Sequence, residues 1–323
     1  MAKAGQSVLA MRKGPTAHWH LSLGEASIAL LPTCLALAWL ISKAQWFWNN
    51  RSELRFGWIV LALSVLMFSE RWRTAPPTVF RWTRPALFFA VAGFTSVILA
   101  QLYSGSFSTG SAVLAALALG VLLVSAANFH QVFGWAGVRH FAFPFLFLLL
   151  ALPIPEMFYR PLVLGLQAGV ASVAVECLEL CGVPAQKIGS LVQLPNCTVG
   201  IDEACSGVRS LQSTVMAALF IGSELLRSRL TRVFLLAAAV ILAVFGNLLR
   251  AFFLAWTASR GGLKALHRYH DSAAWSILLF TAIGTIFLAR AIAKFDRTYA
   301  AATNRLLDGN VQPSPQSLPI SYD

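Results

Sequence analysis

The chain alternates between long apolar runs and short polar or charged connections. Nine apolar runs are bounded by charges or turn residues, at about 23–41, 56–69, 85–103, 111–128, 141–153, 160–181, 204–223, 233–257 and 272–293. A helix needs about 20 mostly apolar residues to cross a hydrocarbon core of roughly 30 Å. The pattern therefore predicts an all-α fold, a polytopic transmembrane helical bundle.

Basic residues gather in a few of the connections. They are Arg71, Arg73, Arg81 and Arg84, then Arg139, then Arg227, Arg229 and Arg232, and finally Lys294 and Arg297. Cytoplasmic loops carry an excess of Lys and Arg, so each of these connections should be cytoplasmic. If all nine runs crossed, the cluster at 227–232 would lie on the opposite side from that at 81–84. One run should therefore not cross.

The run at 160–181 is the best candidate for the segment that does not cross. It follows a Pro-Ile-Pro-Glu break and carries Gln167, Glu176 and Glu179, which are costly near the centre of a bilayer. We expect it to lie along the outer surface or to be re-entrant. About eight spans then remain, and both chain ends lie in the cytoplasm.

This topology predicts one membrane-embedded domain, over residues 23–293. A cytoplasmic N-terminal segment over 1–22 precedes it. A cytoplasmic tail over 294–323 follows and is expected to be disordered, since it is rich in Pro and Ser from Asn310 onward.

Two connections should face outward, at residues 154–203 and 258–270. Within the first, Gly, Pro and Asn residues separate short β-prone pieces such as Ser190–Leu194. The pattern predicts a small extracytoplasmic hairpin over 183–203.

Composition supports a lipid environment. The chain is 57% hydrophobic and 12% charged, whereas soluble domains carry about 25% charged residues. Its net charge of +12 is explained by the basic connections, which indicate orientation in a bilayer and not a nucleic-acid partner. The five cysteines follow no CxxC or Cys/His spacing, so we expect no metal and no cofactor.

Cys205 is the cysteine best placed to act as a nucleophile. Asp202 is a good N-cap residue for the apolar run that follows, which would put Cys205 in the first turn of a helix. The unpaired N–H groups and the helix dipole there favour a thiolate. The alternative is a packing cysteine, because free cysteine is often buried as a small hydrophobe.

Arg250 lies several residues inside an apolar run, where a charged side chain costs about 2.5–3.5 kcal/mol on insertion scales. Such a cost suggests a function. Asn247, one turn earlier on the same helical face, could hold the guanidinium in place. The alternative is snorkelling, since about seven residues would put Arg250 on the order of 10 Å below the outer end of the span.

His270 and Asp271 lie at the expected outer end of the last span. The near-neutral pKa of histidine suits the transfer of a proton from a thiol to a leaving amine. An interfacial histidine or a helix cap would explain the same residues, and His267 is a second candidate for the proton transfer.

The predicted topology places Cys205, Arg250 and His270 on the same outer side. A thiolate that attacks a peptide carbonyl needs a proton shuttle and a donor for the oxyanion, and these three residue types supply the three roles. Arg209, four residues after Cys205, is a second candidate cation. Its structural alternative is an ion pair with Glu203 or Asp202.

These residues resemble the motifs of the exosortase/archaeosortase family. The resemblance rests on Glu203-Ala204-Cys205-Ser206-Gly207-Val208-Arg209-Ser210, on Asn247-Leu248-Leu249-Arg250, and on His270-Asp271, with Leu152-Pro153-Ile154-Pro155, Pro161 and Gln167 upstream. It covers about residues 140–293, which would form the catalytic core. One departure is that Ala273, Ala274 and Trp275 occupy a stretch where the family often has a glycine.

The resemblance implies a membrane-embedded cysteine peptidase or transpeptidase. Cys205 would be the nucleophile, His270 the acid and base, and Arg250 the oxyanion stabiliser. The partner would be the C-terminal transmembrane sorting signal of exported, PEP-CTERM-like proteins, cleaved on the periplasmic face of a bacterial inner membrane. The sequence does not identify the acyl acceptor or the oligomeric state.

Two alternatives come from other classes of protein. A membrane transporter or an export-complex scaffold, acting on polysaccharide or lipid-linked substrates, would also contain an intramembrane Arg and a Pro-broken helix. A disulfide between Cys181 and Cys197 is a further structural possibility, since both face outward in the predicted topology.

Overall fold

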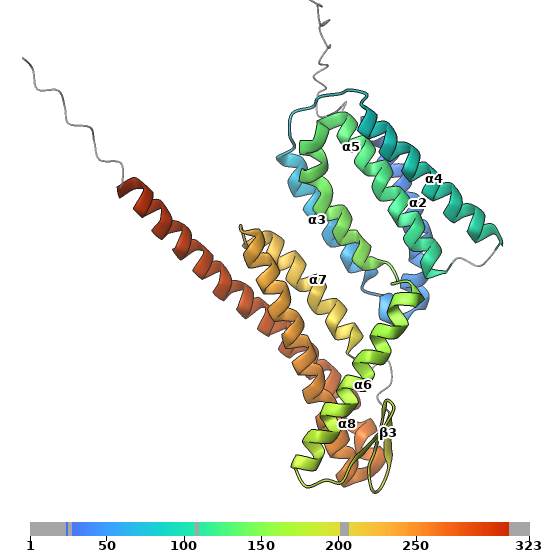
Figure 1. Cartoon of the computed structure of the whole chain (residues 1–323), viewed down its shortest axis with the longest axis vertical. Coiled ribbons are helices and arrows are strands. Elements are labelled where there is room, and N and C mark those ends of the chain that lie inside the picture. Colours follow the sequence, from blue (N-terminus) through green and yellow to red (C-terminus); the bar gives the residue numbers. More distant parts are fainter. Residues whose placement is uncertain (1–23, 25–27, 107–109, 201–206, 310–323) are drawn as a thin grey trace, which may run out of the picture. The chain divides into compact units, whose positions relative to one another are not determined.

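The computed structural model describes residues 24, 28–106, 110–200 and 207–309, with Ser106, Arg209 and residues 297–309 described by backbone alone (Figure 1). The described residues are 83% helical, which confirms an all-α membrane protein. Its elements are α2 (Leu31–Asn50), η1 (Ser52–Leu54), α3 (Gly57–Arg73), α4 (Arg84–Ser106), α5 (Ser111–Leu148), η2 (Leu149–Ala151), α6 (Glu156–Leu180), β1 (Gln186–Ile188), β2 (Leu191–Gln193), β3 (Thr198–Gly200), α7 (Val208–Leu225) and α8 (Arg229–Gly309).

The chain divides into two compact units, and the single membrane-embedded domain over residues 23–293 stays a prediction. The first unit comprises Met1–Asn50 and Ser64–Leu149, and the second comprises Arg51–Leu63 and Leu150–Asp323. Helix α3 therefore contributes to both. All candidate site residues belong to the second unit.

In the first unit, α4 and α5 pack closely through glycine. A Cβ on Gly93 would lie 2.9 Å from the carbonyl oxygen of Gly120, and a Cβ on Gly120 would lie 2.9 Å from that of Gly93. Small residues allow helix backbones to approach in this way, and the resulting van der Waals contacts stabilise helix pairs in a bilayer. An aromatic cluster adds to the core of this unit, formed by Phe68, Trp72, Phe129, Phe133, Phe141 and Phe145.

Helix α5 is folded back on itself. Gly134 has φ 67° and ψ −163°, a conformation that interrupts the helix and that side-chain-bearing residues avoid. The rings of Phe129 and Phe141, on either side of the break, stack with centroids 4.8 Å apart. The separate runs predicted at 111–128 and 141–153 are thus the two arms of one helical hairpin.

Helix α8 in the second unit has the same construction. Gly262, at φ 66° and ψ −166°, interrupts it. The arms then run back along each other, because a Cβ on Gly246 would lie 3.2 Å from Ile277 and one on Gly284 would lie 2.5 Å from Leu242. Residues 258–270, expected as an outward loop, are therefore helical apart from the turn at Gly262.

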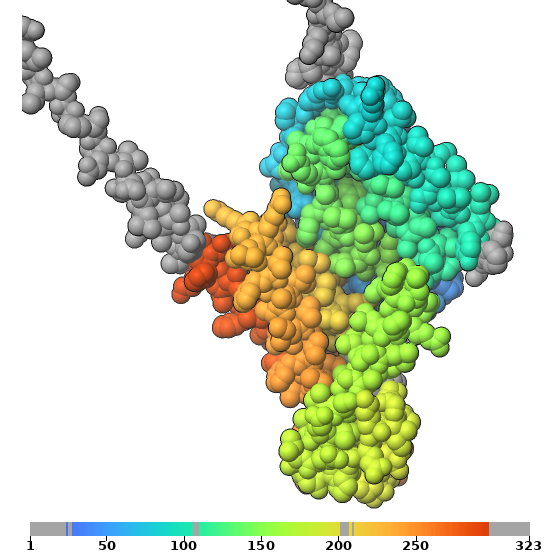
Figure 2. Space-filling model, in the orientation of Figure 1, coloured from blue at the N-terminus to red at the C-terminus, as the bar shows by residue number. Residues whose placement is uncertain are grey.

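A three-stranded antiparallel sheet, in the order β1-β2-β3, occupies residues 186–200. The sequence predicted one hairpin, and the chain makes two, since Leu191–Gln193 pairs with both neighbouring strands. Val192 and Val199 point into a core shared with α6 and α8. Figure 2 shows the strands and the C-terminal part of α6 as one continuous surface.

Each predicted apolar run corresponds to a helix or a hairpin arm among the described residues, with shifted ends. Five described stretches are long and apolar enough to cross a membrane, and two of them are the folded helices α5 and α8. Helix α6 is one of the five, so its expected place on the outer surface stays a prediction, as do the eight spans. The expected disordered tail is helical as far as Gly309; residues 310–323 and the segment 1–22 lie outside the described part.

Candidate active site

The described chain contains four of the six residues singled out from the sequence. Asn247 and Arg250 lie on the first arm of α8, and His270 and Asp271 lie on the second. Cys205 lies outside the described residues, and for Arg209 only the backbone, in the first turn of α7, is described.

Arg250 and His270 contact each other across the α8 hairpin. The distance from Arg250 Nη2 to His270 Nε2 is 3.3 Å. Twenty positions separate the two residues, and the turn at Gly262 brings them face to face. The second candidate, His267, is exposed, so His270 is the histidine that meets the arginine.

This contact assigns the tautomer of His270. A guanidinium only donates hydrogen bonds, so Nε2 must accept and a neutral ring must carry its proton on Nδ1. His270 Nδ1 lies 3.1 Å from Asp271 Oδ1 and donates to it. The Asp271 side chain is 93% exposed, which weakens the pair by solvent screening, and its contribution is to orient the ring.

Asn247 is only 3% exposed and lies against the start of α7. A Cβ added to Gly207 would meet Asn247 Cγ at 2.5 Å, and Gly207 has φ 85°, which favours glycine. The expected contact of Asn247 with the Arg250 guanidinium stays a prediction. The structure shows instead that Asn247 limits how closely α7 can begin beside α8. Only glycine fits between them.

Helix α7 begins later than predicted. Its first residue is Val208, and Gly207 is the N-cap in a left-handed conformation. The Gly207 carbonyl accepts hydrogen bonds from the Leu211 amide and the Ser210 hydroxyl, both at 2.9 Å. The N-cap of α7 is thus Gly207. The prediction that Cys205 lies in a first helical turn, with Asp202 as N-cap, concerns residues outside the described part of the chain and stays a prediction.

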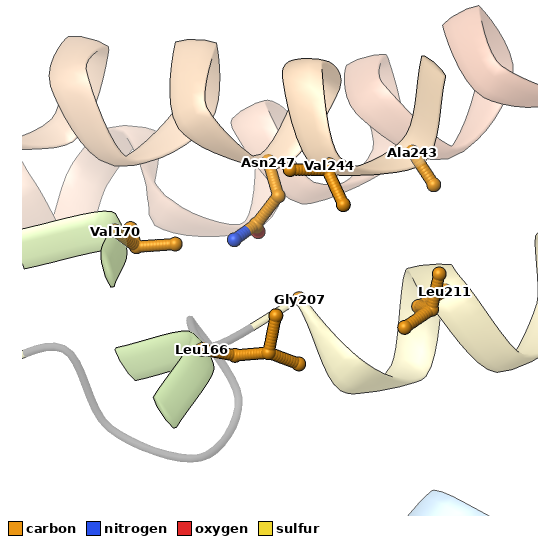
Figure 3. Close-up of a pocket in the computed structure, with 7 residues that line it drawn as sticks. All are labelled: Leu166, Val170, Gly207, Leu211, Ala243, Val244 and Asn247. Atoms are coloured by element: carbon orange, nitrogen blue, oxygen red, sulfur yellow. The ribbon is translucent and has the colours of Figure 1, made fainter. Parts of the chain in front are cut away.

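A small apolar recess lies between α6, α7 and α8 at this point. Leu166 and Val170 come from α6, and Gly207 and Leu211 come from the start of α7. Figure 3 shows the Asn247 amide from α8 directed toward this space. The contribution of α6 was missed from the sequence, although the four-residue spacing of Leu166 and Val170 is typical of a packed helical face.

The described cysteines are all free. Cys197 Sγ lies 3.7 Å from the Ala258 carbonyl oxygen, and Cys181 is exposed at the end of α6. The structure does not form the disulfide considered between them, because Cys197 is directed to α8. The described residues also hold no group of three or more His, Cys, Asp or Glu that could bind a metal ion.

A family model for transmembrane exosortase (Exosortase_EpsH) matches residues 48–287. This chain belongs to the transmembrane exosortase family. The match confirms the resemblance found in the motifs and extends it upstream of residue 140, to the end of α2. Neither a curated protein nor a solved structure gave a match. For an exosortase, the multi-pass membrane character follows from the family and from the apolar helices together.

Proposed function

We propose that this exosortase is a cysteine peptidase or transpeptidase. Cys205 attacks a peptide carbonyl, His270 transfers the proton and Arg250 stabilises the oxyanion. The contact between Arg250 and His270, 3.3 Å across the α8 hairpin, carries this proposal. A cation and a base that meet inside an apolar hairpin are costly to place there, and the proposed chemistry uses both.

The start of α7 supports the third role. Cys205 precedes Gly207 by two residues, so covalent geometry keeps their Cα atoms within about 7.6 Å. Gly207 abuts Asn247, and Asn247 is one helical turn from Arg250. Gly207, two residues after Cys205 in the sequence, thus lies against the helical arm that carries Arg250.

The proposed reaction passes through an acyl-enzyme. The thiol proton moves to His270 Nε2 as sulfur bonds to the carbonyl carbon, and Arg250 stabilises the negative oxygen that results. The C–N bond then breaks and the leaving amine takes the proton from Nε2. An amine acceptor would complete transpeptidation, and water would complete hydrolysis.

The proposed substrate is the C-terminal transmembrane sorting signal of an exported, PEP-CTERM-like protein. A substrate helix can pack against the spans within the bilayer while its flanking peptide reaches the site. Membership of the exosortase family is what supports this proposed partner.

The proposed site faces the periplasm of a bacterial inner membrane. Arg227, Arg229 and Arg232 mark the turn between α7 and α8, which should be cytoplasmic. Twenty-one helical steps from Arg229 raise Arg250 by about 32 Å, close to the thickness of a hydrocarbon core. Arg250 would then lie at the outer interface, where a peptide can approach from water.

Co-expression with a tagged PEP-CTERM-type substrate tests the proposal. We expect the wild type to shorten the substrate and Cys205→Ala, Arg250→Ala and His270→Ala to leave it intact at equal protein levels. Matched controls are Cys181→Ala and His267→Ala, which alter an exposed thiol and an exposed imidazole and should process normally. Normal processing by Cys205→Ala would reject the thiol mechanism and favour a transporter or an export-complex scaffold.

A further inference from the structure

We propose that Arg250 keeps the base of this site latent, and that a substrate carbonyl releases the base when it draws the guanidinium away. The inference rests on the proposed function and adds a second role for Arg250. The same side chain would cover His270 before the reaction and stabilise the oxyanion during it.

Both ring nitrogens of His270 are engaged in the resting site. A neutral imidazole has one acceptor nitrogen, and in His270 this is Nε2, which receives Arg250 Nη2–H at 3.3 Å. The other nitrogen carries its proton and donates it to Asp271 Oδ1 at 3.1 Å. Neither nitrogen can accept a thiol proton while both contacts persist. The base becomes available only when Arg250 moves.

The hairpin limits how this movement can occur. Gly246 and Gly284 hold the two arms of α8 in close contact on the same stretch of helix. Separation of the arms would therefore break the packing around both glycines. Rotation of the long Arg250 side chain releases Nε2 without that loss, so the side chain is the moving part.

Arg250 can bond either to Nε2 of His270 or to the substrate carbonyl oxygen, and the stronger of these bonds decides where it moves. The 3.3 Å contact joins the guanidinium to an uncharged nitrogen acceptor, the neutral Nε2 of His270. A guanidinium bonded to a negative oxygen has a shorter and stronger contact, at about 2.7–2.9 Å. Charge that develops on the substrate carbonyl therefore competes successfully with Nε2 for the guanidinium.

This exchange couples the movement of Arg250 to transfer of the thiol proton. As Arg250 leaves Nε2 for the carbonyl oxygen, Nε2 takes the S–H proton and sulfur bonds to the carbonyl carbon. The π electron pair of the carbonyl moves to the oxygen that Arg250 now contacts. Without a substrate the thiol keeps its proton, which protects it from alkylation and oxidation.

The two possible roles of Arg250 predict opposite changes in the alkylation rate of the thiol. A nearby cation ordinarily stabilises a thiolate and makes it more reactive, so loss of that cation would slow alkylation. If Arg250 instead blocks Nε2 of His270 (the latch), loss of Arg250 frees His270 and speeds alkylation. Both roles predict lower substrate processing, so only the resting reactivity of the thiol separates them.

The experiment uses the full chain in membranes, with Cys34, Cys177, Cys181 and Cys197 replaced by Ala so that Cys205 is the single thiol. Iodoacetamide alkylation at pH 7 is followed by intact mass for this background, for Arg250→Met and for Arg260→Met. Arg260 is the matched control, since its guanidinium stacks 4.6 Å from the Trp256 ring on the same arm of α8. We expect alkylation about 10²-fold faster in Arg250→Met, the lower end of the range for general-base assistance, and no change in Arg260→Met.

His270 variants separate release of the base from simple access to the thiol. Addition of His270→Ala to Arg250→Met should return alkylation to the background rate, whereas His270→Ala alone should change it less than about twofold because Nε2 is already occupied. An unchanged or slower rate in Arg250→Met overturns the latch, and so does a gain that persists without His270.

The alkylation assay needs no substrate, so it is independent of the processing assay. If the wild type leaves every sorting signal intact, the proposed function fails whatever the alkylation rates are. If processing requires Cys205 but Arg250→Met slows alkylation, the function stands and Arg250 serves only as a cation for the thiolate and oxyanion.

Discussion

Helices α5 and α8 use the same backbone device for different purposes. Each folds into a hairpin at one glycine, at φ 67° and ψ −163° for Gly134 and φ 66° and ψ −166° for Gly262. The arms of α5 are joined by stacked aromatic rings such as Phe129 and Phe141. The arms of α8 meet through small residues and through the Arg250 contact with His270.

The difference shows how a membrane protein makes room for a charged site. Aromatic side chains such as Phe129, Phe141 and Phe145 fill the space between the arms of α5. In α8, Gly246 and Gly284 bring the arms together below the site. Close packing by glycine in one part of the hairpin thus supports a polar contact in the next, and the hairpin geometry fixes which residues face each other.

The largest expected effect contrasts a histidine from each hairpin. His270→Ala should lower the rate of substrate processing by about 10²-fold or more, because general acid and base assistance is lost. His140, on the second arm of α5, contacts the Arg71 carbonyl oxygen at 2.9 Å. His140→Ala should leave the rate per folded molecule unchanged, as measured by substrate shortening normalised to monodisperse protein. Equal losses in both variants would remove the functional distinction between the hairpins.

The next effect separates the two turns. Ala at either Gly134 or Gly262 must adopt a backbone conformation that is essentially restricted to glycine, at a cost of about 1–3 kcal/mol. We expect both variants to melt at lower temperature in detergent. Only Gly262→Ala should lower processing per folded molecule, about tenfold, since it shifts His270 against Arg250. Full activity in Gly262→Ala would show that the site does not depend on this turn.

A third, similar test compares close glycine contacts. Gly207→Ala places a Cβ 2.5 Å from Asn247 Cγ and should displace the start of α7, with about tenfold lower processing. Gly120→Ala in the first unit places a Cβ 2.6 Å from Val97 Cγ2 and should cost about 1–3 kcal/mol of stability from overpacking. Substrate shortening and thermal melting, measured on both variants, distinguish the two outcomes. Processing that falls equally in both would indicate a general loss of structure.

The smallest effect concerns Asp271. Its carboxylate orients the His270 ring but is 93% exposed, so water can replace much of its contribution. Asp271→Asn keeps an acceptor oxygen and should retain most activity, while Asp271→Ala should lose less than about tenfold. Rates across pH 5–9 check this, and a loss comparable to that of His270→Ala would mean that the aspartate does more than orient the ring.

Local pattern was enough to predict much of this protein. Hydropathy located the helices because an unsatisfied backbone N–H or C=O group is costly in lipid. A continuous apolar run within the bilayer must therefore form a helix, which satisfies these groups locally. The cost of a cation inside an apolar run pointed to Arg250, and the motifs around Cys205, Asn247 and His270 pointed to the family that the match over residues 48–287 confirms. These inferences needed no knowledge of which helices touch.

Contacts between distant residues depended on folding of the whole chain. Arg250 was expected several residues inside a span, with an outward loop after residue 257. Helix α8 instead continues to the turn at Gly262, and that turn brings Arg250 to His270. The late start of α7 follows from Gly207 and its contact with Asn247, two residues forty positions apart. Hydropathy carries no information on a single φ angle or on how closely Gly207 lies to Asn247, and these decide which side chains meet.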